Sequence, residues 1–286
     1  EGESQRNLDN PRYVRANSFI EDKGYFDSNF FGYLPIEARL MDPQMRILHE
    51  CVRKVIEDAG YDLERVKERI GLFTGAKANL NWEGYAIMEN ADKEIDDFSA
   101  EFLRDINNSN TKISYLLNLR GPSVAINTAC STSLVAIQMA SNSLLLGECN
   151  MAIAGGVTIY NYSKRGYIHE EGMINSQDGH VRPFDATSSG VIGGEGAGVV
   201  LLKKYKNAVK DGDNILAVIR GTGINNDGND KVGYTAPSVN GQTEAIMMAH
   251  KMARIDPKTI TYVEAHGTST KLGDPIEIEA LTRAFG

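Results

Sequence analysis

A single cysteine within a run of small residues is the strongest candidate for chemistry in this chain. Cys130 lies between an apolar run at 124–126, which predicts a buried strand, and an apolar stretch at 134–146, which predicts a helix. The small side chains at 128–133 allow a sharp backbone turn, and the helix N-terminus offers unpaired N–H groups and a partial positive charge. That charge favours the thiolate, the reactive form of cysteine. We therefore predict that Cys130 is a nucleophile rather than a small buried hydrophobic residue.

A histidine in a second segment could handle protons beside this nucleophile. His266 follows a predicted strand at 261–263 and precedes two hydroxyl-bearing residues, Thr268 and Thr270. A histidine at a strand end can point into a cleft and serve as a proton donor or as a partner for an oxyanion. An activated cysteine and such a histidine together indicate nucleophilic catalysis by Cys130 and His266.

The other chemical motifs favour structural roles. Asp274 and Glu277 lie near the start of a helix predicted from Pro275, where we expect them to cap the helix and hold the His266 loop. The glycine-rich segment 190–198 does not have the spacing of a dinucleotide-binding loop, and close backbone packing is the expected use of its glycines.

Composition excludes several classes of protein. The 286 residues carry a net charge of −8, and no basic cluster with interleaved aromatic residues indicates nucleic-acid binding. No apolar run is expected to reach the length of a membrane span, and the polar, acidic N-terminus does not resemble a secretion signal. Three cysteines fit no disulfide framework and no metal site, so a reducing cytoplasm is expected.

The elements that must position these residues alternate between helix and strand. The helix after Cys130, apolar on nearly every side and therefore expected to be buried, leads to a strand at 151–157 and so forms a parallel crossover unit. A long insertion at 160–190 is typical of a segment that covers a site or a partner surface. Other predicted elements are helices at 42–60, 101–106, 112–119 and 238–254 and strands at 70–75, 197–202 and 215–220. This pattern predicts an α/β protein with layered, mainly parallel sheets.

Six segments together resemble β-ketoacyl synthase domains. They are TACSTSL around Cys130, AGGV at 154–157, RPFDA at 182–186, INNDG at 224–228, GYTAPS at 233–238 and VEAHGTST with LGDPIE at 263–277. The resemblance spans nearly all of the chain and is closest to ketosynthases of bacterial modular polyketide synthases or polyketide–peptide hybrids. Ser269 stands where the polyketide pattern often has glycine, but relatives from fatty-acid synthesis also carry serine there.

The resemblance implies a thiolase-like fold, in which two similar halves stack as five layers, αβαβα, in a tight homodimer. Residues 1–205, with the insertion at 160–190, would be the N-terminal half, and 206–286 the start of the C-terminal half. Members of the family also carry a second catalytic histidine, a lysine and a glycine-rich oxyanion loop, at positions that would follow residue 286. We therefore expect the 286 residues to be an internal part of a ketosynthase domain that forms no carbon–carbon bond alone.

The resemblance also implies a reaction. Cys130 would take an acyl chain from the phosphopantetheine arm of an acyl carrier protein domain, with its own backbone N–H as an oxyanion donor. His266 would assist decarboxylation of a malonyl-type extender, whose carbanion then attacks the acyl thioester, and Thr268 and Thr270 would bind pantetheine. The implied partners are carrier protein domains, neighbouring synthase domains and a second copy of the chain. No cofactor is expected to be bound by the chain itself.

Two alternatives stay open at this stage. A transacylating ketosynthase would load Cys130 and pass the chain on without condensation. A non-catalytic scaffold for dimerisation and carrier docking is the other, although the intact TACSTSL context of Cys130 argues against it.

Overall fold

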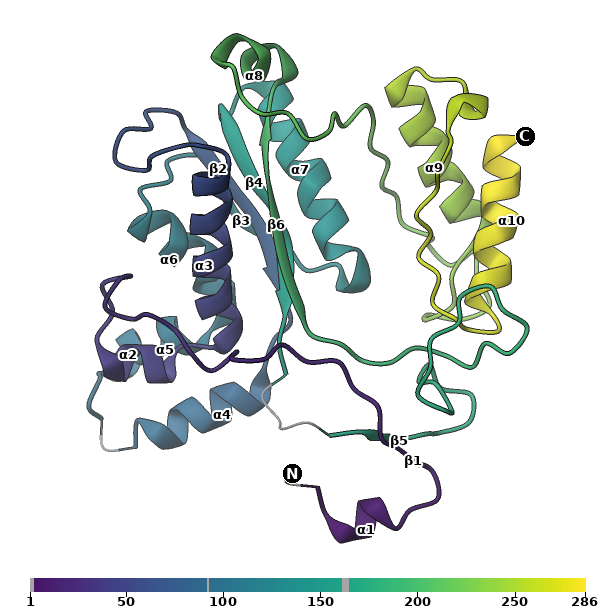
Figure 1. The fold of residues 1–286 in the computed structure, drawn as a ribbon, viewed down its shortest axis with the longest axis horizontal. Coiled ribbons are helices and arrows are strands. Elements are labelled where there is room, and N and C mark those ends of the chain that lie inside the picture. The colour runs from purple at the N-terminus through teal and green to yellow at the C-terminus, as the bar shows by residue number, and fades with distance from the viewer. Residues whose placement is uncertain (1–2, 92, 161–164) are drawn as a thin grey trace. The chain divides into compact units, whose positions relative to one another are not determined.

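The chain divides into two units. The computed structural model describes residues 3–91, 93–160 and 165–286. One unit, the sheet unit, comprises Phe19–Asn161 and Glu195–Leu216, and the other, the helix-pair unit, comprises Glu1–Ser18, Tyr162–Gly194 and Ala217–Gly286. Figure 1 labels the helices and strands of each unit.

A mixed sheet forms the centre of the sheet unit. Its strands are β2 (Ile70–Ala76), β3 (Ser123–Ala125), β4 (Met151–Thr158) and β6 (Gly196–Lys203), in the order β3-β2-β4-β6. β2 pairs in parallel with β3 and β4, whereas β6 runs antiparallel to β4. The predicted crossover between the Cys130 segment and the strand at 151–157 is confirmed, and so is a mainly parallel sheet.

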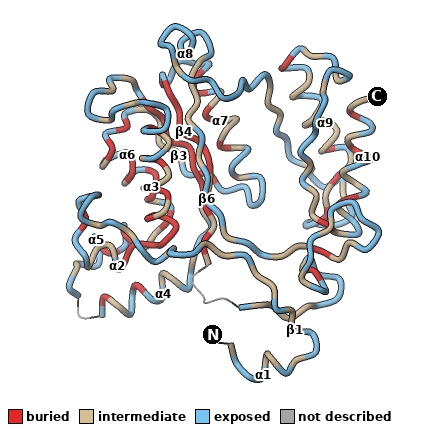
Figure 2. Tube along the Cα trace, viewed as in Figure 1, coloured by how far each residue is buried: buried red, intermediate tan, exposed pale blue. Residues whose placement is uncertain are grey.

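Helices cover both faces of this sheet (Figure 1). α3 (Pro43–Asp58) and α6 (Ser109–Leu116) pack on one face, and α7 (Thr132–Leu146) packs on the other. Because successive strand residues point to opposite faces, Leu72 joins the cluster under α3 and α6 while Phe73 joins the cluster under α7. The buried residues of Figure 2 concentrate in these two layers.

The start of α3 follows from local sequence. The Asp42 side chain accepts a hydrogen bond from the Gln44 N–H at 2.8 Å, and Pro43 occupies the first helical turn. The helix ends before Gly60, whose φ of +79° is easily adopted by glycine. The prediction of this helix is therefore confirmed.

The remaining helical elements of the sheet unit are α2 (Pro35–Leu40), α4 (Leu80–Glu89), α5 (Asp97–Arg104), η1 (Ile106–Asn108), η2 (Ala129–Ser131) and α8 (Tyr205–Asp211).

Among the residues that the structure describes, only one face of α7 is covered, so the prediction of a helix buried all round is wrong. Ala136 and Ala140 lie fully buried against the sheet, whereas Leu134 is 70% exposed and Leu146 is 77% exposed.

The prediction about membrane spans also needs correction. The stretch Ala129–Leu146 has a mean hydropathy of 1.3 and is long and apolar enough, by length and composition, to cross a bilayer. The same test is passed by core helices, and the buried alanines show that α7 packs on a sheet.

The helix-pair unit is built around two helices near the C-terminal end of the chain. α9 (Val239–Ala253) packs against α10 (Gly273–Phe285), and a short antiparallel pair joins β1 (Tyr13–Val14) to β5 (Tyr167–Ile168). The unit also holds α1 (Gln5–Leu8) and η3 (Pro257–Thr259).

The strands predicted at 215–220 and 261–263 are not formed. A strand exists through hydrogen bonds to a neighbouring strand, and within the described residues no strand pairs with either segment. Instead the backbone after 217 lies against α9. A Cβ at Gly221 would lie 2.4 Å from the Ala249 carbonyl oxygen, so only glycine permits this approach.

Candidate active site

A tight turn presents Cys130 at the entrance of α7, as the sequence predicts. The turn is the 3₁₀ helix η2, which follows β3 and leads directly into α7. Ala129, the residue before the cysteine, has a φ of +53°, a left-handed conformation that costs an alanine roughly 1–2 kcal/mol. Cys130 itself is exposed. The strained backbone therefore holds the thiol at the surface of the sheet unit rather than in its core.

Hydroxyl side chains stabilise this turn. The Thr132 hydroxyl accepts a hydrogen bond from the Thr128 N–H at 3.0 Å and donates one to the Ala129 carbonyl at 2.7 Å. The Ser131 hydroxyl donates to the Thr128 carbonyl at 2.9 Å. These bonds tie the backbone of Thr128 and Ala129 to side chains at the start of α7. The small polar residues around Cys130 therefore have a structural function that their sizes alone did not reveal.

A glycine in β2 makes room for the turn. A Cβ at Gly75 would lie 2.0 Å from the Ile126 carbonyl oxygen and 2.3 Å from the Thr132 methyl carbon. Both distances are far shorter than van der Waals contact, so the Cys130 turn can approach the carboxyl end of β2 only because residue 75 has no side chain. Binding sites of α/β proteins lie at this edge of the sheet.

The three cysteines differ in accessibility. Cys149 is buried, with its Sγ 3.4 Å from the Ser143 hydroxyl, and Cys51 is half-buried. Burial raises the pKa of the Cys51 thiol and so disfavours its thiolate. Cys130, the exposed one, is thus the cysteine that a large substrate can reach.

The His266 loop is held by a carboxylate on α10. Glu277 accepts a hydrogen bond from the His266 N–H at 2.6 Å with one oxygen and from the Gly267 N–H at 2.9 Å with the other. Gly267 has a φ of +53°, which favours glycine at this position. His266 is exposed. The predicted role of Glu277 in holding this loop is confirmed, and it acts through the backbone.

Two buried polar side chains fasten the same loop to the RPFDA segment. The Asp274 carboxylate accepts a hydrogen bond from the Phe184 N–H at 2.7 Å, and the Ser269 hydroxyl accepts one from the Arg182 N–H at 2.9 Å. Asp274 is 5% exposed and Ser269 is fully buried. Sequence reasoning missed this connection, because the partners are about 90 residues apart; the only signal was the RPFDA motif itself.

The hydroxyls of Thr268 and Thr270 lie together at the start of α10. Their oxygens are 2.9 Å apart, and the Gly273 N–H donates to the Thr270 hydroxyl at 3.0 Å. The structure therefore places His266, Thr268 and Thr270 on one loop. Cys130 belongs to the sheet unit and this loop to the helix-pair unit, so their cooperation stays a prediction.

A buried carboxylate in the glycine-rich segment was also missed. Glu195, whose side chain is 1% exposed, pairs with the Lys23 ammonium at 2.5 Å and accepts hydrogen bonds from the N–H groups of Ile20 and Tyr160. It joins three chain segments at the start of β6.

Within the described residues, no group of three or more His, Cys, Asp or Glu side chains is placed to hold a metal ion.

Comparison with known proteins assigns the chain to a family. Residues 1–208 match the model of the β-ketoacyl synthase N-terminal domain, and residues 216–286 match that of the C-terminal domain. The chain belongs to the β-ketoacyl synthase family. It is 42% identical over 292 residues to one component of the phenolphthiocerol/phthiocerol polyketide synthase of Mycobacterium tuberculosis, covering 99% of this chain and 20% of that protein. It is 44% identical over 280 residues to the polyketide synthase PksN of Bacillus subtilis, covering 97% of this chain and 5% of that protein.

Solved ketosynthases share the fold of this β-ketoacyl synthase chain. The crystal structure of ketosynthase twelve from the bacillaene polyketide synthase of Bacillus amyloliquefaciens superposes with a TM-score of 0.94 at 42% identity, covering 99% of this chain and 50% of that one. The ketosynthase from module 1 of the bacillaene synthase of the same species gives a TM-score of 0.84 at 44% identity, covering 93% and 46%. The predicted thiolase-like fold and the resemblance to polyketide ketosynthases are confirmed. The chain spans about half the length of these solved ketosynthases.

Proposed function

We propose that these 286 residues are part of a polyketide ketosynthase, which extends an acyl group by decarboxylative condensation. The observation that carries the proposal is the exposed Cys130 on the left-handed Ala129 turn, within a chain of the β-ketoacyl synthase family. The Cys130 thiolate attacks the acyl thioester of a carrier protein and releases the carrier thiol. An extender thioester then loses CO₂, and its carbanion displaces Cys130 to form a β-ketoacyl thioester.

Each predicted site residue has a place in this sequence of steps. The backbone N–H of Cys130 donates to the oxyanion that forms on the acyl carbonyl. His266 assists the loss of CO₂ from the extender. Thr268 and Thr270 hydrogen-bond the pantetheine arm, and their position beside His266 on one loop supports this role.

The same proposal includes the partners. Substrates arrive on the phosphopantetheine of carrier protein domains, and the relatives are large modular synthases, which supports neighbouring synthase domains. We propose a homodimer, because β3 is an edge strand of the described sheet and its outer backbone groups are available for pairing. Three free cysteines favour a cytoplasmic location.

The test of the nucleophile is acyl transfer to the full-length protein. Incubation with an acyl-pantetheine donor should add one acyl group to the peptide that contains Cys130, measured as a mass shift. Cys130→Ala should abolish the shift, while the matched variants Cys51→Ala and Cys149→Ala should retain it. Acylation that persists in Cys130→Ala would refute the assignment.

The test of His266 separates the two half-reactions. His266→Ala should leave acylation of Cys130 largely intact and reduce extender decarboxylation by roughly 10²- to 10⁴-fold, the usual contribution of a general acid or base. Formation of the β-ketoacyl product by the unmodified protein supports elongation. Acyl transfer without any condensation product would favour a transacylating ketosynthase instead.

A further inference from the structure

The Thr132 hydroxyl bonds to the backbone on both sides of the left-handed Ala129. It accepts a hydrogen bond from the Thr128 N–H at 3.0 Å and donates its own proton to the Ala129 carbonyl at 2.7 Å. A hydroxyl has a single proton, so this proton is committed to the Ala129 carbonyl. Because a φ of +53° is unfavourable for alanine, the two bonds are what hold Ala129 in this conformation.

The bond to the Ala129 carbonyl also fixes the direction of the Cys130 N–H. The two groups belong to one planar peptide unit, and because the peptide bond between Ala129 and Cys130 is trans they point in opposite directions. A bond that holds the carbonyl therefore holds the N–H as well. The first helical bond of η2 runs from the Ser131 N–H to the Thr128 carbonyl at 3.3 Å, so the Cys130 N–H precedes the hydrogen-bond ladder of the helix.

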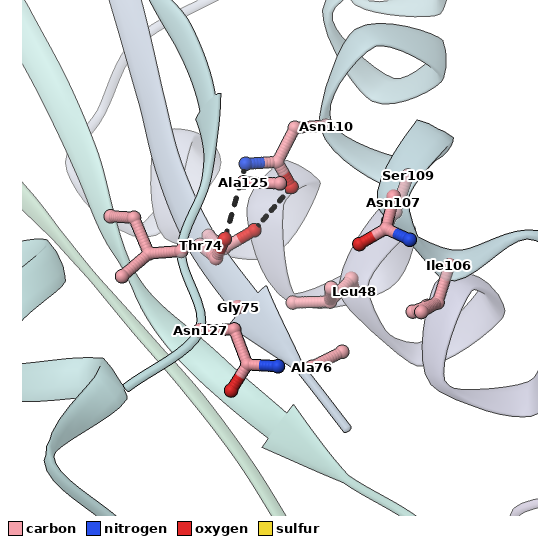
Figure 3. Close-up of a pocket in the computed structure, with 11 residues that line it drawn as sticks. Leu48, Thr74, Gly75, Ala76, Ile106, Asn107, Ser109, Asn110, Ala125 and Asn127 are labelled. Carbon is pink, nitrogen blue, oxygen red and sulfur yellow. Dashed lines mark hydrogen bonds between the residues drawn. The ribbon is translucent and has the colours of Figure 1, made fainter. Parts of the chain in front are cut away.

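The strand that leads into the turn is fixed separately. The Asn110 amide nitrogen donates to the carbonyls of Thr74 and Val124, and its oxygen accepts from the Thr74 hydroxyl at 2.6 Å (Figure 3). The Ile126 N–H donates to the Thr74 carbonyl at 3.1 Å. These bonds tie the backbone at 124–126 to β2 and α6 without Thr132, so a change at Thr132 acts on the turn rather than on the strand before it.

The methyl group of Thr132 has a different contact from its hydroxyl. It lies against β2, where a Cβ at Gly75 would come within 2.3 Å of it. Serine at residue 132 keeps the hydroxyl and loses the methyl group, whereas valine keeps a methyl group there and loses the hydroxyl. Substitution can therefore separate the hydrogen bonds of Thr132 from its packing.

We propose that Thr132 is a positioning residue for acyl transfer, whose hydroxyl aims the Cys130 N–H at the oxyanion through the Ala129 carbonyl. The inference rests on the proposed acylation of Cys130. In that step the thiolate attacks the thioester carbonyl carbon, and the carbonyl oxygen becomes an oxyanion. When the carbonyl forms again, the bond to the pantetheine sulfur breaks, and the leaving thiolate takes up the proton that the Cys130 thiol lost. An N–H aimed in advance at the oxyanion stabilises the transition state, and a misdirected one does not.

Two reactions of Cys130 separate the direction of its N–H from the exposure of its thiol. Acyl transfer from an acyl-pantetheine forms an oxyanion, whereas alkylation by iodoacetamide displaces iodide and forms none. Both rates are measured on the full-length protein by mass spectrometry of the peptide that contains Cys130. Thr132→Val and Thr132→Ala should lower the saturating rate of acylation by roughly 10- to 100-fold without changing the half-saturating donor concentration. Alkylation should change by less than about threefold, because it needs no oxyanion donor.

Two further variants are controls. Thr132→Ser should keep acylation within about threefold of the unmodified protein, because serine retains the hydroxyl. Thr111→Val is the matched control on α6, since the Thr111 hydroxyl donates to the Asn108 carbonyl at 3.0 Å with the same three-residue spacing that joins Thr132 to Ala129. It should leave both rates unchanged.

Three results would overturn the positioning role. They are unchanged acylation in Thr132→Ala, an equal loss of acylation and alkylation in Thr132→Val and Thr132→Ala, and a loss in Thr132→Ser as large as in Thr132→Val.

A second acyl donor distinguishes failure of this role from failure of the proposed reaction. p-Nitrophenyl acetate also forms an oxyanion but carries no pantetheine. If it acylates Cys130 in a Thr132-dependent manner while acyl-pantetheine does not react, the proposed reaction is wrong and the positioning role stands. If acyl-pantetheine acylates Cys130 equally in all variants, the reaction stands and the positioning role is refuted. If Cys130 takes an acyl group from neither donor, both are refuted.

Discussion

The Glu277 carboxylate accepts a hydrogen bond from the backbone N–H of His266 at 2.6 Å, although the two residues are 11 positions apart in the sequence. Its second oxygen holds the next N–H, that of Gly267, at 2.9 Å. Two backbone donors of one loop thus meet the two oxygens of one side chain on α10. The imidazole of His266 is positioned through its own main chain.

We predict that Glu277→Gln lowers extender decarboxylation by roughly tenfold or more, because a neutral amide accepts with one oxygen only and a charge-assisted hydrogen bond is lost. Acylation of Cys130 should change by less than about threefold. The measurement is CO₂ release from a malonyl-type extender beside acylation by mass spectrometry. Glu279→Gln is the control, since Glu279 lies on the same helix and pairs with Arg283 at the surface. Equal loss of both half-reactions would show that the loop fails to fold.

A side chain at residue 75 should displace the Cys130 turn. We predict that Gly75→Ala lowers the free energy of unfolding by at least about 1–3 kcal/mol, because its Cβ would meet the Ile126 carbonyl and the Thr132 methyl group. Acylation should fall as well. Gly84→Ala is the control: Gly84 lies within α4 with no atom within 4 Å of an added Cβ, so the change should stabilise the protein by roughly 0.5–1 kcal/mol. Denaturant unfolding of both variants tests the prediction, and equal effects would contradict it.

Asp42 should make stability depend on pH. Burial raises the pKa of this carboxyl from 3.8 to about 6, against the opposing effect of its hydrogen bond from Gln44. The folded state therefore holds a proton that the unfolded state has lost, so the contribution is fully present below about pH 4 and is lost as the pH rises through about 6. Its size is about 3 kcal/mol.

The variant Asp42→Asn isolates this effect, because asparagine keeps a cap acceptor and does not ionise. We predict that the free energy of unfolding of Asp42→Asn, minus that of the unmodified protein, increases between about pH 4 and pH 7. Urea unfolding at intervals of about one pH unit over this range measures it. A difference that stays constant over the range would contradict the prediction.

Lys203 should stabilise the end of β6. Its ammonium lies 2.6 Å from the Tyr61 hydroxyl, 2.6 Å from Asp211 and 2.8 Å from Asp213, and its side chain is 9% exposed. We predict that Lys203→Met lowers the free energy of unfolding by about 2–4 kcal/mol, because two acidic partners lose their cation. Lys206→Met, an exposed change on α8, should alter it by less than about 0.5 kcal/mol. Equal stability of the two variants would show that the ion pairs contribute nothing.

Much of the sheet unit could be predicted from short stretches of sequence. The Asp42-Pro43 start of α3, the strands β2 and β4 and the Cys130 turn each follow from signals a few residues long: a cap, a run of apolar residues, a cluster of small side chains. Boundaries were less accurate, since α5 begins at Asp97 rather than at 101 and α6 at Ser109 rather than at 112. Local signals determine that an element exists, whereas packing determines where it stops.

Tertiary structure alone decided which surfaces are covered and which groups meet. Sequence could not show that Leu134 and Leu146 of α7 remain exposed, because an apolar residue becomes buried only where a partner lies against it. Nor could it show that the segment 215–220 stays without a ladder, because a strand needs hydrogen bonds from another part of the chain. Cys130 was recognisable from its neighbours along the chain. The bond from Phe184 to Asp274 and the unpaired hydroxyl of Ser109 were not, because both depend on residues brought together, or kept apart, by packing over long sequence distances.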